Sequence, residues 1–253
     1  MRLELKYLVP LHLLDQIRSD LLIYTDYDKH VLARQDKQYT VKSIYYDTKR
    51  FEYYYEKIAG IKRRKKIRIR GYNNLDLNPN CNTEVFLEIK RKNENFISKN
   101  RSRVLYRDLD NLLTSGDIDS YILPDNNRDA RGDAGKFLFH YFHKALKPVV
   151  LVVYEREAFF SKFDARFRVS FDKNIRSRIF PAPANLFDNA PMKSSLMGKF
   201  VLEVKYSGPH PRWMRDLIYD YRLTQRPVSK YTISLDQHKI WQSMNRFRIY
   251  GAA

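Results

Sequence analysis

The chain has 253 residues, of which 43% are hydrophobic and 14% aromatic, so it can bury one sizeable core. Lys and Arg number 47 against 29 Asp and Glu, and the net charge of +18 implies an anionic partner such as nucleic acid, an anionic membrane surface or a phosphate compound. The single cysteine, Cys81, excludes an internal disulfide and a cysteine-based zinc site, and no apolar run approaches the roughly 20 residues that a membrane helix needs.

The beginning of the chain carries charges within a strand pattern and does not resemble a signal peptide, which predicts a cytoplasmic protein. The sequence shows no repeat at solenoid spacing and no low-complexity tract. Its most loop-like segment, residues 125–133 (DNNRDARGD), is too short for a domain linker. We therefore expect residues 1–253 to form a single domain.

The first predicted strand, residues 2–9, alternates charged and apolar side chains. Successive side chains of a strand point to opposite faces, so Arg2, Glu4 and Lys6 share one face. A half-buried strand usually turns such a face to water. The alternative is a face that points into the protein, toward something that needs both cations and a carboxylate.

The remaining elements follow from the spacing of the apolar residues. In chain order, strands are predicted over residues 41–47, 65–72, 84–92, 149–159, 163–171 and 199–206. Helices are predicted over residues 11–24, 108–113, 134–146, 211–223 and 234–247, and connections over 48–57, 73–83 and 180–194. Because strands dominate and helices cluster between and after them, the pattern favours an α+β fold with a largely antiparallel sheet.

The charged faces of several of these strands are rich in Lys and Arg. Residues 65–72, for example, place Lys66, Arg68 and Arg70 on one face. Antiparallel sheets often keep one face in water, which is the ordinary explanation. Like charges on neighbouring strands repel each other, however, and helices are available to cover the apolar faces. A sheet curled into a barrel with its basic face inside would instead enclose an anion.

A phosphate compound suits such an interior, because Arg offers a planar fork to phosphate oxygens and Lys a compact charge. Glutamates isolated among these cations, such as Glu88 and Glu203, make sense there if they hold a divalent metal ion. The metal would bridge phosphate oxygens and offset the charge that develops during phosphoryl transfer. The basic run at residues 62–66 (KRRKK) could draw anionic substrate toward the site, or form a nucleic-acid or membrane patch.

Residues 2–7 (RLELKY) resemble the first-strand signature Glu-x-Glu-x-Lys of the triphosphate tunnel metalloenzymes. More specifically, the chain is similar to the VTC domain, the catalytic domain of the vacuolar polyphosphate polymerase complex and of bacterial relatives. Seven further segments carry this resemblance in order: SIYYDT (43–48), KIRIRGY (66–72), EIKRK (88–92), YEREAF (154–159), RVSFD (168–172), LEVKY (202–206) and SKY (229–231). The resemblance implies an antiparallel β-barrel, the triphosphate tunnel, with a basic interior and helices wrapped around it.

The resemblance also implies a function. The chain would be a metal-dependent polyphosphate polymerase that transfers the terminal phosphate of ATP to a growing polyphosphate chain, with Mn²⁺ or Mg²⁺ as cofactor. Its partners would be ATP, polyphosphate and inorganic phosphate, and nucleic acid is not expected. A membrane protein that this chain does not encode is a further partner to consider, which would place the domain in the cytoplasm at the periphery of a membrane.

Carried over by position, the resemblance implies three groups of site residues. The catalytic cations would be Lys6, Arg68, Arg70, Lys90, Arg156 and Lys230. Further substrate-binding residues would be Arg103, Tyr154, Arg168, Ser229, Arg2 and Lys205. Glu203 would be the principal metal ligand, with Glu4 and Glu88 as further carboxylates. Arg2 replaces the first glutamate of the wider signature, which removes one potential metal ligand and favours the polymerase-like branch.

Two other functions stay open at this point. One is a tunnel triphosphatase that hydrolyses tripolyphosphate or a nucleoside triphosphate, with water in place of phosphate as the acceptor. The other is a non-catalytic module that binds polyphosphate or a nucleotide. A non-specific nucleic-acid binder would differ from all of these by losing affinity steeply with salt and needing no metal.

Overall fold

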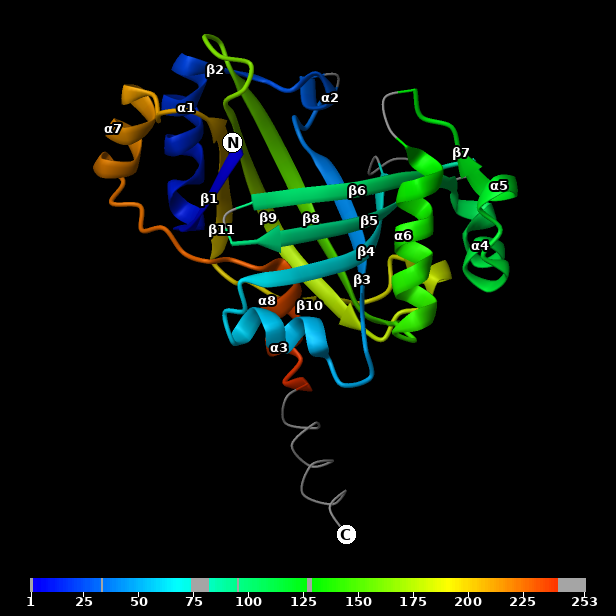
Figure 1. The fold of residues 1–253 in the computed structure, drawn as a ribbon. Coiled ribbons are helices and arrows are strands. Elements are labelled where there is room, and N and C mark those ends of the chain that lie inside the picture. Colours follow the sequence, from blue (N-terminus) through cyan, green and yellow to red (C-terminus); the bar gives the residue numbers. More distant parts are fainter. Residues whose placement is uncertain (1, 33, 74–81, 95, 127–128, 241–253) are drawn as a thin grey trace.

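The computed structural model describes residues 2–32, 34–73, 82–94, 96–126 and 129–240, and of Arg2 and Asn73 the backbone alone. Cys81, most of the predicted connection 73–83 and the end of the predicted helix 234–247 lie outside the described residues. Figure 1 shows one large curved sheet with helices placed around it.

The described strands form one sheet in which every pair of neighbours is antiparallel. Their bounds are β1 Arg2–Pro10, β2 Thr25–Tyr27, β3 Tyr39–Asp47, β4 Arg63–Asn73, β5 Glu84–Asn93, β6 Phe96–Leu105, β7 Ile122–Leu123, β8 Lys147–Ser161, β9 Arg168–Ile179, β10 Lys193–Ser194 and β11 Lys199–Ser207. The order is β1-β11-β9-β8-β3-β4-β5-β6-β7, with β10 paired to β9 and β2 to β8. The expected α+β fold with an antiparallel sheet is confirmed.

The helices lie between and after the strands in the chain. Their bounds are α1 Leu14–Tyr24, α2 Lys29–Leu32, α3 Glu52–Ile58, α4 Leu109–Ser115, α5 Ile118–Tyr121, α6 Ala130–His143, α7 Arg212–Asp220 and α8 Lys230–Gln237, with 3-10 turns at Leu11–Leu13, Tyr106–Asp108 and Pro183–Asn185. Among the described helices, none has the length and apolar character needed to cross a membrane.

Apolar residues of the alternating strands face the surrounding helices. Ile67 and Ile69 of β4 are fully buried in a cluster that includes Phe137 of α6 and Leu112 of α4. A second cluster joins β1, β9 and β11 to α1 and α7. The opposite face of the sheet carries the cations, and Lys6, Arg68 and Arg156 on this face line an inner cavity. The solvent-facing explanation for this basic face is wrong.

The curl of the sheet brings its ends toward each other. Glu4 of β1 accepts a hydrogen bond from Lys90 of β5 at 2.9 Å, although β1 and β5 are not neighbours in the strand order. Over the described residues, the hydrogen-bonded path is open, with β1 and β7 at its two ends. The architecture is thus barrel-like, and side-chain ion pairs across the interior connect walls that the backbone does not join.

Several elements were not expected from the sequence, and the longest of them are strand β6 and helix α3. Strand β6 carries mostly polar residues on both faces and lies near the edge of the sheet, so it lacks the apolar alternation that reveals a half-buried strand. Helix α3 overlaps the predicted connection 48–57 and ends one residue after it. Its start depends on Asp47, whose carboxylate accepts hydrogen bonds from the backbone N–H groups of Thr48 (2.7 Å), Tyr53 (3.0 Å) and Tyr54 (3.0 Å).

Asp47 also positions α8 inside the curl of the sheet. The Tyr231 hydroxyl of α8 donates a hydrogen bond to the buried Asp47 carboxylate, and the Tyr231 ring stacks on Tyr45 of β3 at 5.1 Å between centroids. Burial raises the pKa of Asp47 to about 6, against the hydrogen bonds it accepts from Tyr231 and from the backbone. Because α8 begins at Lys230, four residues before the predicted start, Ser229 and Lys230 reach the interior of the sheet.

Candidate functional site: a cation-lined interior

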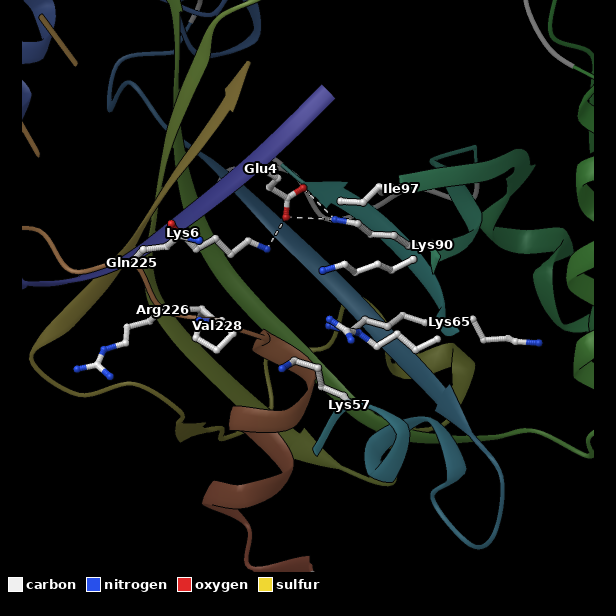
Figure 2. A pocket seen from close by; sticks show the side chains of 13 residues that line it. Glu4, Lys6, Lys57, Lys65, Lys90, Ile97, Gln225, Arg226 and Val228 are labelled. Atoms are coloured by element: carbon white, nitrogen blue, oxygen red, sulfur yellow. Dashed lines mark hydrogen bonds and ion pairs between the residues drawn. The ribbon is translucent and has the colours of Figure 1, made fainter. Parts of the chain in front are cut away.

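Two adjoining cavities occupy the concave side of the sheet. The inner cavity, of about 90 Å³, is lined by Glu4, Lys6, Tyr45, Lys66, Arg68, Arg70, Lys90, Tyr154, Arg156, Glu203, Lys205, Ser229 and Lys230. The outer cavity, of about 220 Å³, shares Glu4, Lys6, Lys66 and Lys90 with it and adds residues such as Lys57, Arg64 and Lys92. Figure 2 shows Lys6 and Lys90 reaching toward Glu4 from different strands, with Lys57 pointing into the same space.

Strands β1 and β11 supply two carboxylates and their counter-ions. The antiparallel register places Lys6 opposite Glu203 and Glu4 opposite Lys205, so unlike charges meet across the pair. Lys6 Nζ lies 2.6 Å from Glu4 Oε1 and 3.3 Å from Glu203 Oε2, and Lys205 also forms an ion pair with Glu203. The Glu203 side chain is 4% exposed.

Both carboxylates are ionised at neutral pH. Burial and the nearby Glu203 oppose ionisation of Glu4, but Lys6, Lys90 and Lys205 outweigh them and lower the pKa of Glu4 to about 2. Burial likewise opposes ionisation of Glu203, and Lys205 and Lys6 hold its pKa well below the usual range. These oxygens can therefore accept hydrogen bonds or coordinate a cation.

A third carboxylate, Asp172 of β9, organises the cations of β8 and α8. Arg156 donates two hydrogen bonds to it, from Nε at 2.6 Å and from Nη2 at 2.8 Å, and Lys230 forms an ion pair with the same group. Burial opposes the charge on Asp172, while Arg156 and Lys230 lower its pKa. Asp172 shares its strand face with Arg168 and Ser170, yet the sequence offered no reason to prefer it as a site residue.

Strand β4 presents its cations in one row. Arg68 Nη2 lies 2.7 Å from Glu88 and its Nη1 donates to the Tyr45 hydroxyl at 3.0 Å. Arg70 donates to the Ser43 hydroxyl at 3.0 Å and to the Tyr154 hydroxyl at 3.4 Å. Arg68 is thus held by a carboxylate, whereas the hydrogen-bond partners of Arg70 within the described residues are hydroxyls.

Most of the expected site residues come together in the inner cavity. They are Lys6, Arg68, Arg70, Lys90, Arg156, Lys230, Tyr154, Ser229, Lys205, Glu203 and Glu4. The cavity also contains Lys66 and Tyr45, which the prediction left out. Lys66 had a usable signal, because it shares a strand face with Arg68 and Arg70.

Four expected residues lie elsewhere. Glu88 lines neither cavity and is surrounded by Arg68, Lys99 at 2.5 Å and Arg101 at 3.3 Å. Arg103 is bound by Glu84 at 3.1 Å. Arg168 is exposed at the start of β9, 4.1 Å from the centre of the Phe160 ring. Arg2 is the first residue of β1 and lies opposite Ser207 of β11 in the strand register. Its side chain lies outside the described residues.

The donor set suits a hard divalent cation that is completed by its substrate. Within the described residues, no group of three or more His, Cys, Asp and Glu side chains is arranged to hold a metal ion. Glu4 and Glu203 nevertheless place two ionised carboxylates in one cavity. Mg²⁺ is usually bound by one or two carboxylates together with substrate phosphates, so this pair fits such an ion.

Comparison with known proteins identifies a family and a relative that match most of this chain. A family model described as the VTC domain matches residues 1–239. Vacuolar transporter chaperone complex subunit 4 of Schizosaccharomyces pombe is 23% identical over 228 residues, which cover 77% of this chain and 31% of that protein. The chain thus spans about a third of the length of that relative.

The chain is also similar to two solved structures. The PH1819 protein from Pyrococcus horikoshii OT3 has a TM-score of 0.49 and 13% identity, over 94% of this chain and 99% of that one. A candidate adenylate cyclase from Bacillus halodurans also has a TM-score of 0.49, with 12% identity over 90% of this chain and 94% of that one.

Proposed function

The chain belongs to the VTC domain family, and from this premise we propose that it is a metal-dependent polyphosphate polymerase. It would transfer the terminal phosphate of ATP to a growing polyphosphate chain. One observation carries the proposal: ionised Glu203 and Glu4 share an inward-facing cavity with cations from β1, β4, β5, β8 and α8. Because these cations line a recessed cavity of about 90 Å³, an oligophosphate suits them better than a nucleic-acid duplex does.

The ion pairs of the cavity would orient the cations and leave donors for phosphate. Arg156 uses Nε and Nη2 for Asp172, so its remaining N–H groups can meet phosphate oxygens. Arg70 is bound by hydroxyls, so its positive charge is available to a substrate. We assign Lys6, Arg68, Lys90 and Lys230 to the same task, together with Tyr154, Ser229 and Lys205.

Glu203 and Glu4 are the residues that would hold Mn²⁺ or Mg²⁺. When bound, such an ion would neutralise phosphate oxygens and so favour the charge distribution of phosphoryl transfer. Glu88 is not part of this proposal, because three cations surround it.

The two cavities suggest how donor and acceptor would be aligned. The phosphates of ATP would occupy the inner cavity, and the acceptor chain would extend through the outer one. A terminal oxygen of the acceptor would form the new bond to the γ-phosphorus while the bond to the β–γ bridging oxygen breaks and ADP leaves. Alignment and charge stabilisation by the cations would supply the catalysis, with no covalent enzyme intermediate.

Product analysis tests the polymerase directly. Incubation of the purified chain with ATP and Mn²⁺ is expected to convert ATP into ADP and to join the γ-phosphates in a polymer long enough to resolve on a polyacrylamide gel. Most of the transferred phosphate should be recovered in the polymer, because cations of the outer cavity would hold the phosphate acceptor in place.

The same assay separates the alternatives. Orthophosphate release without polymer would replace the proposal by a triphosphatase. Metal-strengthened binding of tripolyphosphate with no turnover would replace it by a binding module. A reaction without added metal serves as the control for both.

A position at the periphery of an anionic membrane is the location that we propose for this activity. Ile58 and Ile61, in and after α3, and Phe96, at the start of β6, are exposed near the outer cavity. The turns that carry them are joined, because Glu94 N donates to Lys62 O at 3.1 Å. Exposed apolar groups beside a basic run are typical of surfaces that bind anionic lipid.

Vesicle sedimentation tests this location. We expect binding to vesicles that contain anionic lipid and a loss of at least about tenfold in binding for Ile58→Ser/Ile61→Ser/Phe96→Ser, because each buried apolar side chain contributes roughly 1.5–3 kcal/mol. Phe139→Ser/Phe142→Ser, on the exposed face of α6, is the matched control and should bind like the wild type. Equal binding by both variants would contradict this location.

A further inference from the structure

Lys66 differs from the other lysines of the inner cavity in its partners. Its Nζ donates a hydrogen bond to the Ser229 hydroxyl at 2.7 Å. Among the described residues, no carboxylate forms an ion pair with it. By contrast, Lys6 and Lys90 both contact Glu4, and Lys230 contacts Asp172.

The charged groups that act most strongly on Lys66 are cations: Lys6 of β1, Lys90 of β5, Arg68 of β4 itself and Lys57 of α3. Lys230 of α8 and the carboxylates of Glu4 and Glu203 line the inner cavity with Lys66. Both carboxylates are already paired, Glu4 with Lys6 and Lys90 and Glu203 with Lys6 and Lys205. Lys90 is the direct cross-strand partner of Lys66, an arrangement in which like charges are unfavourable. Burial, followed by the charges of Lys6 and Lys90, holds the pKa of Lys66 well below the usual range.

A phosphate chain in the cavities would reverse this environment. Lys66 lines both the inner and the outer cavity, so it stands where the two adjoin. Phosphate oxygens there would offset Lys6, Lys90 and Arg68 and offer acceptors to the Lys66 amine. The charged form of the amine would then be favoured, since an opposite charge within a few ångströms stabilises it.

We propose that Lys66 couples oligophosphate binding to proton uptake: its amine takes one proton from solvent and becomes the ammonium that contacts the incoming phosphate. No bond other than the N–H bond forms. The inference rests on the substrate class of the proposed function and adds a role for a residue between the two cavities.

The sign of the pH dependence follows from linkage. The complex holds one proton more than the free protein between the lowered pKa of free Lys66 and its higher pKa in the complex. Affinity for oligophosphate therefore rises as the pH falls through that window. One linked proton corresponds to a change of at most about tenfold in affinity for each pH unit.

Calorimetry with tripolyphosphate tests the coupling without turnover. Titrations of the whole chain in buffers of different ionisation enthalpy, at one pH within the window, give the number of protons taken up. The wild type is expected to take up as much as one proton more than Lys66→Arg. The guanidinium is permanently charged, so the variant should still bind tripolyphosphate but without the additional proton.

Lys205→Met is the matched control, because it also removes a cavity cation, but one that is paired with Glu203. It should bind more weakly and take up as many protons as the wild type. Equal proton uptake by the wild type and Lys66→Arg would overturn the role of Lys66 and leave the proposed function standing. A wild type that does not bind tripolyphosphate would overturn both.

Discussion

Replacement of Glu203 by Gln is expected to lower the rate of polymer synthesis by about a thousand-fold, the scale seen when a preorganised electrostatic group is removed from an active site. The substitution keeps the shape of the side chain and removes its charge. Lys6 and Lys205 then lose a shared counter-ion, and the cavity loses the better buried of its two candidate metal ligands. The measurement is the initial rate of polymer formation from ATP at saturating Mn²⁺.

Glu157→Gln is the matched control for this prediction. Glu157 is also a buried glutamate between two cations: Arg18 Nε lies 2.7 Å from it, and Lys173 forms a second ion pair. It lies on the other face of β8 from Arg156, toward α1, away from both cavities. Both variants should lose stability in urea, whereas Glu203→Gln alone should lose polymer synthesis. Similar rates for the two variants would refute the role of Glu203.

Replacement of Asp172 by Ala is expected to lower the free energy of unfolding by about 3–5 kcal/mol, the cost of breaking a buried ion pair from one side. Asp172 is fully buried, and its removal leaves Arg156 and Lys230 without their shared carboxylate. Tripolyphosphate should restore more stability to this variant than to the wild type, because bound phosphate would supply the missing negative charge. Urea denaturation with and without tripolyphosphate measures both effects.

Asp164→Ala provides the comparison for Asp172→Ala. Asp164 forms an ion pair with Arg166 at 3.0 Å in an exposed turn before β9, so its removal should leave the urea midpoint unchanged. If tripolyphosphate stabilises Asp172→Ala no more than the wild type, then Asp172 does not position cations for phosphate.

The alternation of charged and apolar residues correctly predicted which side chains of β4 share a face of the sheet. Lys66, Arg68 and Arg70 of β4 point inward while Ile67 and Ile69 pack against the helices, as their spacing predicts. The prediction was incomplete where this signal is weak. Strand β6 has no apolar face, and the start of α3 depends on hydrogen bonds to Asp47 rather than on apolar spacing.

The site was less predictable than the strands. Position in the chain suggested Glu88 as a metal ligand, yet the neighbouring strand β6 brings Lys99 and Arg101 to it. Position also suggested no role for Asp172, although two cations of the cavity depend on it. A carboxylate's function depends on the groups that reach it from other strands, and those groups are distant in the sequence.

The sequence by itself determined the class of the fold, the basic character of one sheet face and the residues that alternation places on it. These features are local, because the side-chain period of a strand is two residues wherever the strand lies. Only the tertiary structure decided that this face is concave and which cations keep a carboxylate partner. Glu4 meets Lys90 across 86 residues of chain, and Lys66 has no such partner among the described residues, because the curl of the sheet sets these distances.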